Sequence, residues 1–368
     1  MDKKRIYLSA PHMSGNELKN IQKVFESNYI APVGEYVNKF EESIKNYTGS
    51  KNALAVSSGT AAIHLALRVL GIKDGDDVIA STFTFIGSVS AVLYQNANPI
   101  FIDSDKETWN LSPKLLNKYL LECEKKPKAL IVTHVYGMCA DIQKIADICR
   151  LHGIYLIEDS AESLGTTYNS KHTGTFGDFG IYSFNGNKII TTSGGGMLVS
   201  DNQKWMEKAK FYATQAKEDE IYYEHIEYGY NYGISNVLSA IGVAQLEVIE
   251  QRIEKKREIF GWYKEFLKDA KGISFMPELK NTRGNRWLSV IIVEKISYKK
   301  IMFALETINV ESRPLFKPMH LQPLFKNTKT YLDGTSEYLY ETGVCLASST
   351  SMTKNDVKMV CDAIFTVL

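Results

Sequence analysis

Two segments, Ile154-Tyr-Leu-Ile-Glu-Asp159 and Tyr182-Ser-Phe-Asn-Gly-Asn-Lys188, contain the pattern that most strongly indicates the fold. The first segment is a short apolar run that ends on two carboxylates. The second ends on a lysine in a polar turn, which is followed by Gly194-Gly-Gly196. A short continuous apolar run is typical of a strand that is buried on both faces of a parallel sheet. The stretch Ile154–Val199 therefore predicts central strands with an acid at the end of one and a lysine in the loop after another.

Outward from this stretch, the chain repeats a pattern of strand, turn and helix. Short apolar runs predict seven strands, at Ala53–Val56, Val78–Ala80, Pro99–Asp103, Ala129–Thr133, Ile154–Glu158, Phe179–Phe184 and Met197–Val199. Helical stretches lie between several of them, at Thr60–Leu70, Phe85–Tyr94, Pro113–Glu122 and Asp141–Leu151. This alternation indicates an α/β fold with a mainly parallel sheet between helices. Ligands of such sheets lie beyond the carboxyl ends of the strands, here Ser57–Thr60, Thr82–Phe85, Asp103–Asp105, His134–Gly137 and Asp159–Glu162.

The last third of the chain predicts a second, smaller domain. One long amphipathic helix is expected from about Ala240 to Leu267, leading out of the large domain. A strand at Trp287–Val293, a helix at Tyr298–Ile308 and a final helix from Thr353 follow, as in an α+β domain. We therefore expect a large domain at residues 1–250 and a small C-terminal domain at residues 251–368.

The composition argues against several classes of protein. The net charge of the 368 residues is +1 and the basic residues are spread out, so the sequence predicts no basic surface for nucleic acid or for an anionic membrane. No apolar run approaches the roughly 20 residues that span a bilayer, and the N-terminus lacks the pattern of a signal peptide. The five cysteines have the spacing of neither a zinc site nor a disulfide framework. We expect a cytoplasmic protein without a metal, a membrane or a nucleic-acid partner.

Two strand ends in the first half of the chain carry groups that could hold a ligand. Ser57-Ser-Gly-Thr60 supplies small side chains and free backbone N–H groups at the start of a helix, which suits a phosphate. The same residue types are also common helix caps with no ligand at all. Phe85 follows the next strand, where its ring could stack on a flat heterocycle or belong to the core.

The acids and the lysine within Ile154–Val199 are more specific signals of a ligand site. Side chains alternate along a strand, so Glu158 and Asp159 cannot both face a ligand, and a buried carboxylate needs a partner. We expect Glu158 to be paired within the protein and Asp159 to face the ligand. Lys188 is either an ordinary loop lysine or, beside Ser183, a Schiff-base nucleophile. An acid and a lysine in these places predict pyridoxal phosphate, whose aldehyde needs a lysine amine and whose ring nitrogen needs an anionic partner.

With these residues in view, the chain resembles the DegT/DnrJ/EryC1/StrS family of pyridoxal-phosphate aminotransferases that act on nucleotide-linked sugars. The matching motifs run through the chain in order: Ser57-Ser-Gly-Thr-Ala-Ala62, Phe83-Thr-Phe85, Glu158-Asp-Ser-Ala-Glu162, Ser183-Phe-Asn-Gly-Asn-Lys188, Gly194-Gly-Gly196 and Gly229-Tyr-Asn-Tyr232. A closer likeness, to the enzymes that aminate C4 of a UDP-linked 4-keto-6-deoxy-N-acetylglucosamine on the route to bacillosamine, is carried by Ser27–Pro32, Asn185–Gly196 and Arg313–His320. The resemblance implies the PLP-dependent transferase fold type I, with a seven-stranded large domain and a smaller α+β domain.

For the cofactor, pyridoxal 5′-phosphate, the resemblance implies a role for each matching residue. Lys188 would form the Schiff base, and Asp159 would pair with the ring nitrogen. Phe85 would stack on the ring, and Glu162 would lie near the ring hydroxyl, where many relatives have Gln.

The remaining assignments concern the cofactor phosphate and the nucleotide sugar. Gly59, Thr60 and Ser183 would bind the phosphate, and Asn231 would reach it or the substrate across the interface of a homodimer. The residues assigned to the nucleotide sugar are Tyr29, Ile30, Ala31, Pro32, Thr60, Asn231, Arg313, Pro314, Leu315, Phe316 and His320. This assignment replaces a simpler interpretation of residues 27–34 as a loop packed on the core. Gly233 departs from the family pattern, because relatives often have Arg there.

The reaction that the resemblance implies is a transamination in two halves. L-Glutamate would aminate the cofactor, which would aminate C4 of a UDP-linked 2-acetamido-2,6-dideoxy-4-keto-hexose to give a precursor of bacillosamine. One alternative is another nucleotide-linked 4-keto-6-deoxy sugar, of the altrosamine, perosamine or dTDP-sugar type. Lys188 disfavours a sugar dehydratase of the same fold, in which His replaces the lysine. The lack of a basic DNA-binding segment disfavours a regulator that only binds the cofactor.

Overall fold

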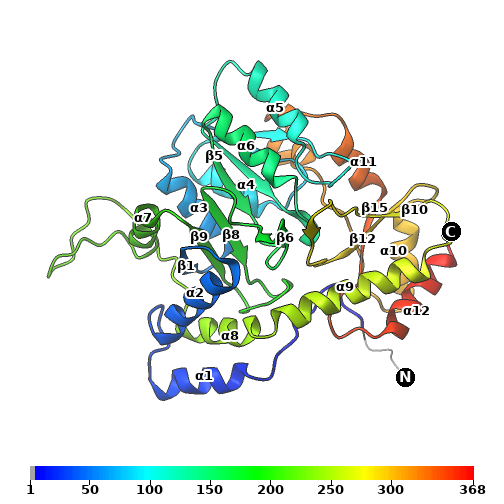
Figure 1. Cartoon of the computed structure of the whole chain (residues 1–368), viewed down its shortest axis with the longest axis horizontal. Coiled ribbons are helices and arrows are strands. Elements are labelled where there is room, and N and C mark those ends of the chain that lie inside the picture. Colours follow the sequence, from blue (N-terminus) through cyan, green and yellow to red (C-terminus); the bar gives the residue numbers. More distant parts are fainter. Residues whose placement is uncertain (1–4) are drawn as a thin grey trace.

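The computed structural model describes residues 5–368, and its largest element is an eight-stranded sheet (Figure 1). The strand order is β1-β9-β8-β5-β4-β2-β3-β14. The strands are β1 (Asn52–Val56), β2 (Asp77–Ser81), β3 (Asn98–Ile102), β4 (Ala129–Thr133), β5 (Tyr155–Asp159), β8 (Phe179–Ser183), β9 (Gly196–Ser200) and β14 (Lys329–Tyr331). Strand β9 runs antiparallel to both of its neighbours, and the other pairings are parallel. The predicted α/β fold with a mainly parallel sheet is confirmed.

Helices cover both faces of this sheet. One face packs against α3 (Gly59–Val69), α4 (Gly87–Tyr94) and α7 (Gln203–Ala213), and the other against α5 (Pro113–Glu122) and α6 (Ile142–His152). Alternate side chains of β5 show the two faces, because Ile157 packs in the core beneath α3 and Leu156 in the core beneath α6. Helix α2 (Glu35–Thr48) lies beside β1, whereas α1 (Glu17–Glu26) packs against α8 (Asn236–Leu246).

The sheet has one strand more than the seven that the sequence predicts. Strand β14 comes from the C-terminal part of the chain and pairs in parallel with β3, so that Thr330 lies opposite Phe101. Its three residues, Lys329-Thr-Tyr331, form no apolar run, and β14 lies at the edge of the sheet. An edge strand need not be apolar on both faces, which is why the pattern did not reveal it.

The single helix expected from about Ala240 to Leu267 is in fact two helices. Helix α8 (Asn236–Leu246) is capped by Ser235, whose side chain accepts a hydrogen bond from the Leu238 N–H. Helix α9 (Ile249–Phe266) starts after a break at residues 247–248 and extends from the large sheet to the small one (Figure 1). Ile253 packs in the core of the large sheet, whereas Tyr263 packs in the core of the small one. The division of the chain at residue 250 stays a prediction.

The C-terminal part contains a four-stranded antiparallel sheet in the order β10-β12-β15-β13. Its strands are β10 (Ile273–Phe275), β12 (Ser289–Val293), β13 (Arg313–Pro314) and β15 (Gly343–Leu346). The helices of this part are α10 (Tyr298–Thr307), α11 (Thr335–Thr342) and α12 (Lys354–Phe365). A small third sheet is formed by β11 (Thr282–Arg283), β6 (Thr167–Tyr168) and β7 (Lys171–His172). In the described part of the chain, no helix has the length and apolar character needed to cross a membrane.

Candidate active site

A cavity of about 510 Å³ lies beyond the carboxyl ends of β1, β2, β4, β5 and β8. This is the place that the sheet topology predicts for a ligand, and the volume suits a small molecule. The predicted site residues that line it are Gly59, Thr60, Phe85, Asp159, Glu162, Ser183, Lys188, Arg313, Pro314 and Phe316. They come from both ends of the sequence, and the fold brings them together.

An anion can be held where α3 begins at the edge of the cavity. Ser58 caps the helix by accepting a hydrogen bond of 3.0 Å from the Ala61 N–H. The N–H groups of Gly59 and Thr60 lie in the first helical turn, where the helix itself offers no acceptor. A side chain in place of Gly59 would lie 3.3 Å from Ser183 Cβ, and one at Gly196 would collide with the backbone of residues 58–59. These two glycines therefore let strand and helix approach closely enough to form a phosphate-sized recess.

Asp159 ends β5 and faces the cavity. One carboxylate oxygen accepts a 2.5 Å hydrogen bond from the Ser88 hydroxyl, and the other accepts one of 3.1 Å from the Ala161 N–H. The residue is only 5% exposed, and within residues 5–368 no cationic side chain pairs with it. A buried carboxylate without a cation is costly, so this position suits a positively charged ligand atom.

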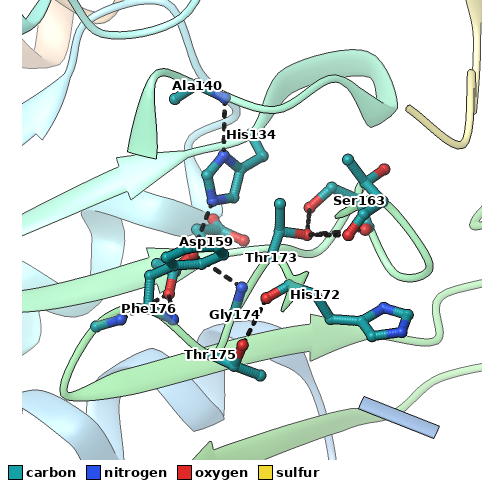
Figure 2. Close-up of polar contacts among 12 residues, drawn as sticks. His134, Ala140, Asp159, Ser163, His172, Thr173, Gly174, Thr175 and Phe176 are labelled. Atoms are coloured by element: carbon teal, nitrogen blue, oxygen red, sulfur yellow. Dashed lines mark hydrogen bonds and ion pairs between the residues drawn. The ribbon is translucent and has the colours of Figure 1, made fainter. Parts of the chain in front are cut away.

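Glu158 points to the opposite face of the sheet and is satisfied by the protein, as predicted. Its carboxylate accepts hydrogen bonds from the N–H groups of Gly174, Phe176 and Gly177, at 2.9, 2.6 and 2.7 Å. His134 Nε2 lies 3.1 Å from the same carboxylate, while Nδ1 accepts from the Ala140 N–H (Figure 2). The Ala140 bond makes Nδ1 an acceptor, so Nε2 carries the proton that is donated to Glu158. This network fixes the strand that presents Asp159.

Lys188 lies in the loop between β8 and β9, with its amine directed into the cavity wall. Its Nζ is 3.3 Å from Glu162 Oε1 and 4.4 Å from the centre of the Trp287 ring. The other oxygen of Glu162 accepts a 2.7 Å hydrogen bond from the Tyr136 N–H. Burial raises the pKa of the Glu162 carboxyl, and the neighbouring Lys188 ammonium opposes that shift. The indole Nε1–H of Trp287 donates to the Asn187 carbonyl, which holds the lysine loop in place.

Phe85 presents a free ring to the cavity. It is 58% exposed, and its aromatic neighbour is Phe316, whose ring centre lies 6.4 Å away. An exposed phenylalanine on a cavity wall offers a face on which a flat ring can stack.

The residues that surround the cavity fit pyridoxal phosphate. The helix N-terminus with Ser183 can hold a phosphate dianion, and Lys188 offers an amine for the aldehyde. Asp159 has no cationic partner among residues 5–368, which suits a protonated pyridine nitrogen, and Phe85 offers a stacking face. Each part of the cofactor thus finds a chemically matching group on the wall of one cavity.

Arg313 lies at the exposed side of the cavity. Its guanidinium is held by Glu311, with Nη2–Oε1 and Nε–Oε1 distances of 2.8 and 3.1 Å. Glu311 is itself tied to the N-terminal segment, because its second oxygen accepts a 3.0 Å hydrogen bond from the Leu8 N–H. The charge of Arg313 is therefore held near the opening, where an anionic substrate would enter.

Other predicted residues lie away from the cavity of this chain. Tyr29, Ile30, Ala31, Pro32 and Asn231 are exposed, and none of them lines it. Their roles in binding stay predictions. The loop at 29–31 is held by Asn236, which donates to the carbonyls of Tyr29 and Ala31.

Two residues of the segment at 313–320 are also placed differently from the prediction. Leu315 is buried in the core, and the His320 ring lies between Thr82 Oγ1 and Glu337 Oε1, at 2.7 and 3.1 Å. Neither lines the cavity, although both were expected to bind the sugar nucleotide. The strand end at Asp103 is likewise engaged, because its carboxylate binds the N–H groups at the start of α11.

Sequence reasoning missed several residues of the cavity wall. Ser88, Tyr136 and Trp287 line it and contact Asp159, Glu162 and Lys188 respectively. The sequence around each is that of an ordinary helix, loop or strand, so no local signal marks it.

Lys256 on α9 is buried behind this wall, and it leads to a prediction about stability. Its Nζ donates to the Trp287 carbonyl at 2.8 Å and to Ser9 Oγ at 3.0 Å. Burial lowers the pKa of Lys256 from 10.5 to about 7. Between these values the unfolded chain binds the proton and the folded chain does not. The free energy of unfolding should therefore rise with pH from about 7 to 10.5, by up to about 1.4 kcal/mol per unit.

The measurement is denaturant unfolding of the wild type and Lys256→Met across this pH range. The wild type should gain stability relative to Lys256→Met as the pH rises. The control is Lys268→Met, which changes an exposed lysine and should keep the wild-type slope. Parallel curves for wild type and Lys256→Met would show that Lys256 is charged in the folded protein throughout.

Comparisons with known proteins agree with the geometry of this site. Residues 11–365 match the model of the DegT/DnrJ/EryC1/StrS aminotransferase family. EpsN of Bacillus subtilis (strain 168), named as an inferred pyridoxal phosphate-dependent aminotransferase, is 48% identical over 361 residues, 96% of this chain and 93% of EpsN. GDP-perosamine synthase of Vibrio cholerae is 36% identical over 359 residues, 96% of each chain.

A solved structure shows the same fold. The PLP-form of Spr1654 from Streptococcus pneumoniae, described as an inferred sugar aminotransferase, superposes with a TM-score of 0.91. The match covers 99% of this chain and 98% of Spr1654, at 21% sequence identity.

Proposed function

The chain belongs to the DegT/DnrJ/EryC1/StrS aminotransferase family, and from this premise we propose that it aminates C4 of a UDP-linked 2-acetamido-2,6-dideoxy-4-keto-hexose. Pyridoxal phosphate is the cofactor and L-glutamate is the amino donor. The product is UDP-4-amino-4,6-dideoxy-N-acetylglucosamine, the precursor of bacillosamine. One observation carries the proposal: Lys188 and Asp159 face one cavity whose exposed side carries Arg313.

The chemistry is divided between the cofactor and the side chains. Bound pyridoxal phosphate supplies a carbonyl that carries the amino group and a ring that accepts negative charge. At rest Lys188 Nζ would hold the cofactor at that carbonyl, and once released it would take the proton from Cα of glutamate as a general base and pass it to the cofactor. In the second half Lys188 Nζ would carry a proton from the cofactor to C4 of the sugar, which then bears the new amine.

Two carboxylates, those of Asp159 and Glu162, are proposed to assist this proton movement. Asp159 would hold a proton on the ring nitrogen, because within residues 5–368 its buried carboxylate pairs with no cationic side chain. Glu162 Oε1, 3.3 Å from Lys188 Nζ, orients the amine and accepts a hydrogen bond from its charged form. Trp287 and Phe316 on the cavity wall keep water from the reacting atoms.

Arg313 is proposed to bind the diphosphate of the nucleotide sugar. A guanidinium binds phosphate through two parallel hydrogen bonds, and Glu311 holds this one in a fixed direction. Arg313→Gln should therefore raise the KM for the nucleotide sugar about 10- to 100-fold, with the reaction of glutamate unchanged. Steady-state kinetics with varied nucleotide sugar measures the first effect, and single-turnover conversion of the bound cofactor measures the second. A loss confined to the glutamate half would place Arg313 on the donor instead.

We also propose a homodimer in which each subunit completes the site of the other. The segment between α7 and α8 projects far from the rest of the chain (Figure 1). It carries exposed apolar side chains, which are Ile221, Tyr222, Tyr223, Ile226 and Tyr228. Such residues on a projecting segment favour burial against a partner. Asn231 and the loop at 29–32 are exposed in one chain, which fits the proposal that they serve the cavity of the partner.

The reaction is proposed to take place in the cytoplasm. All five cysteines of the sequence are free thiols, of which four are buried. Free buried thiols are typical of proteins from a reducing compartment.

The experiment that tests the function supplies the enzyme with glutamate and a panel of UDP-, GDP- and dTDP-linked 4-keto-6-deoxy sugars. The proposal expects the UDP-linked N-acetyl sugar to be aminated with the highest kcat/KM. Amination of a GDP- or dTDP-linked sugar alone would overturn the substrate assignment. Visible absorption of the bound cofactor, followed on addition of glutamate alone, reports the first half-reaction without any sugar.

A second candidate, a GDP-linked acceptor, is favoured by the likeness to GDP-perosamine synthase over 96% of each chain. Both candidates use the same amine chemistry at C4 and differ in the base and the C2 substituent of the acceptor. The same panel of sugars separates them.

A further inference from the structure

Tyr136 has an unusual backbone conformation next to the cavity. Its φ is 56° and its ψ is 19°, in the left-handed region that bulky residues seldom adopt. The residue is 1% exposed and lies just after the end of β4. A strained conformation of this kind persists only where the surroundings hold it, and it is typical of functional sites.

The contacts of Tyr136 explain why this conformation is held. Its backbone N–H donates to Glu162 Oε2 at 2.7 Å, and its hydroxyl accepts a 2.8 Å hydrogen bond from the Phe316 N–H. Its ring stacks on the ring of Phe316, with centres 5.0 Å apart and planes 13° apart. The left-handed backbone therefore lets one residue bind Glu162 with its main chain and Phe316 with its side chain.

These contacts link Lys188 to Phe316 through Glu162 and Tyr136 along the cavity wall. Lys188 Nζ lies 3.3 Å from Glu162, Glu162 binds the Tyr136 N–H, and the Tyr136 hydroxyl binds Phe316. Phe316 belongs to the segment at 313–316, whose first two residues pair with β15 of the small sheet. Tyr136 thus joins a segment anchored in the small sheet to the wall that carries the reactive amine.

We propose that Tyr136 is a positioning residue that fixes the segment at 313–316 relative to Lys188, and so sets how the acceptor sugar nucleotide lies over the amine. The proposal rests on the proposed function, because it takes this segment as part of the acceptor site. It goes beyond that function by naming the residue that joins the acceptor segment to the catalytic lysine.

The testing variant is Tyr136→Phe. It keeps the ring, the stack on Phe316 and the backbone bond to Glu162, and it removes the hydroxyl that accepts from the Phe316 N–H and also contacts the Cys345 thiol. A backbone N–H left without a partner should shift the segment. The KM for the acceptor sugar nucleotide should rise about tenfold, while glutamate converts the bound cofactor at the wild-type rate. Steady-state kinetics measures the KM for the acceptor, and single-turnover absorption of the holoenzyme measures the rate at which glutamate converts the cofactor.

The matched control is Tyr263→Phe. Tyr263 is also fully buried, and its hydroxyl also makes one backbone hydrogen bond, of 2.8 Å to the Ala347 carbonyl, in the core of the small sheet. This variant loses the same group but should keep the wild-type KM. Thermal unfolding of both variants shows how much stability each loses, so that a general loss of packing is separated from a local effect.

A double variant with Arg313→Gln shows whether Tyr136 acts through the segment. If it does, Tyr136→Phe should raise the KM much less in the Arg313→Gln background than alone, because the group it positions has already been lost. Fully additive effects of the two substitutions would overturn the proposal.

The acceptor in these assays is whichever sugar of the panel the wild type aminates best. A GDP-linked acceptor would therefore correct the substrate assignment and still test Tyr136. An unchanged KM in Tyr136→Phe would overturn the positioning role while the aminotransferase function stands. An equal slowing of both half-reactions would overturn it as well, because it would indicate a general packing role.

Discussion

Lys188→Ala is expected to lose about 10⁴-fold of its multiple-turnover amination activity. In the proposed mechanism Lys188 Nζ would both hold the cofactor and move the proton at Cα of glutamate and at C4 of the sugar. Among the described residues that line the cavity, no equivalent base is free, because Glu162 already binds the Tyr136 N–H, and Asp159 is bound by Ser88 and proposed to pair with the ring nitrogen. The measurement is the steady-state rate of product formation with saturating glutamate and nucleotide sugar.

The control for this variant is Lys204→Ala, which removes an exposed lysine from α7. It should keep the wild-type rate. Multiple-turnover amination by Lys188→Ala at a normal rate would remove Lys188 from the mechanism, whatever its position in the cavity.

Asp159→Asn has the second largest expected effect, about a 10³-fold loss of kcat/KM. The amide has the shape of the carboxylate but carries no charge, so it no longer favours a proton on the ring nitrogen of the cofactor. Without that proton the ring accepts less charge at the step where a Cα proton leaves. Both half-reactions should slow together, because each needs the ring to accept negative charge while a proton moves, from Cα of glutamate in the first half and to C4 of the sugar in the second. The measurement is single-turnover kinetics of each half, with absorption of the cofactor as the signal.

Asp178→Asn is the matched control for Asp159→Asn. Asp178 is a partly buried carboxylate just before the start of β8, where it accepts a 2.8 Å hydrogen bond from the Leu156 N–H. Its loss should lower stability and leave the two half-reactions near the wild-type rates. A similar kinetic loss in both variants would show that the effect of Asp159→Asn reflects damage to the sheet.

The parts of the fold that the sequence predicted have strong local patterns. The seven buried strands are apolar runs bounded by turns, and they alternate with amphipathic helices. Strand β14 and the break between α8 and α9 have no such pattern. The break at Glu247–Val248 contains neither Gly nor Pro, so the helical spacing continues through it in the sequence. Both features depend on contacts with distant segments.

The residues of the site also divide into those with a local signal in the sequence and those without one. Asp159 and Lys188 could be predicted because an acid at a buried strand end and a lysine after the neighbouring strand carry a chemical meaning by themselves. Tyr136 and Trp287 could not, because their places depend on a left-handed backbone and on a segment just before β12 that lies against the lysine loop. The segment at 313–320 was predicted as a unit, but only three of its residues line the cavity.

Strand β14 has a consequence for how the chain reaches its native state. It covers the edge of β3, which would otherwise expose unpaired N–H and C=O groups to other molecules. A chain cut at residue 250 would lack β14, and its large sheet should associate through that edge. Domains usually fold as they emerge during synthesis, but this sheet is complete only once residue 331 has been made. The two predicted domains are therefore expected to fold in one cooperative step.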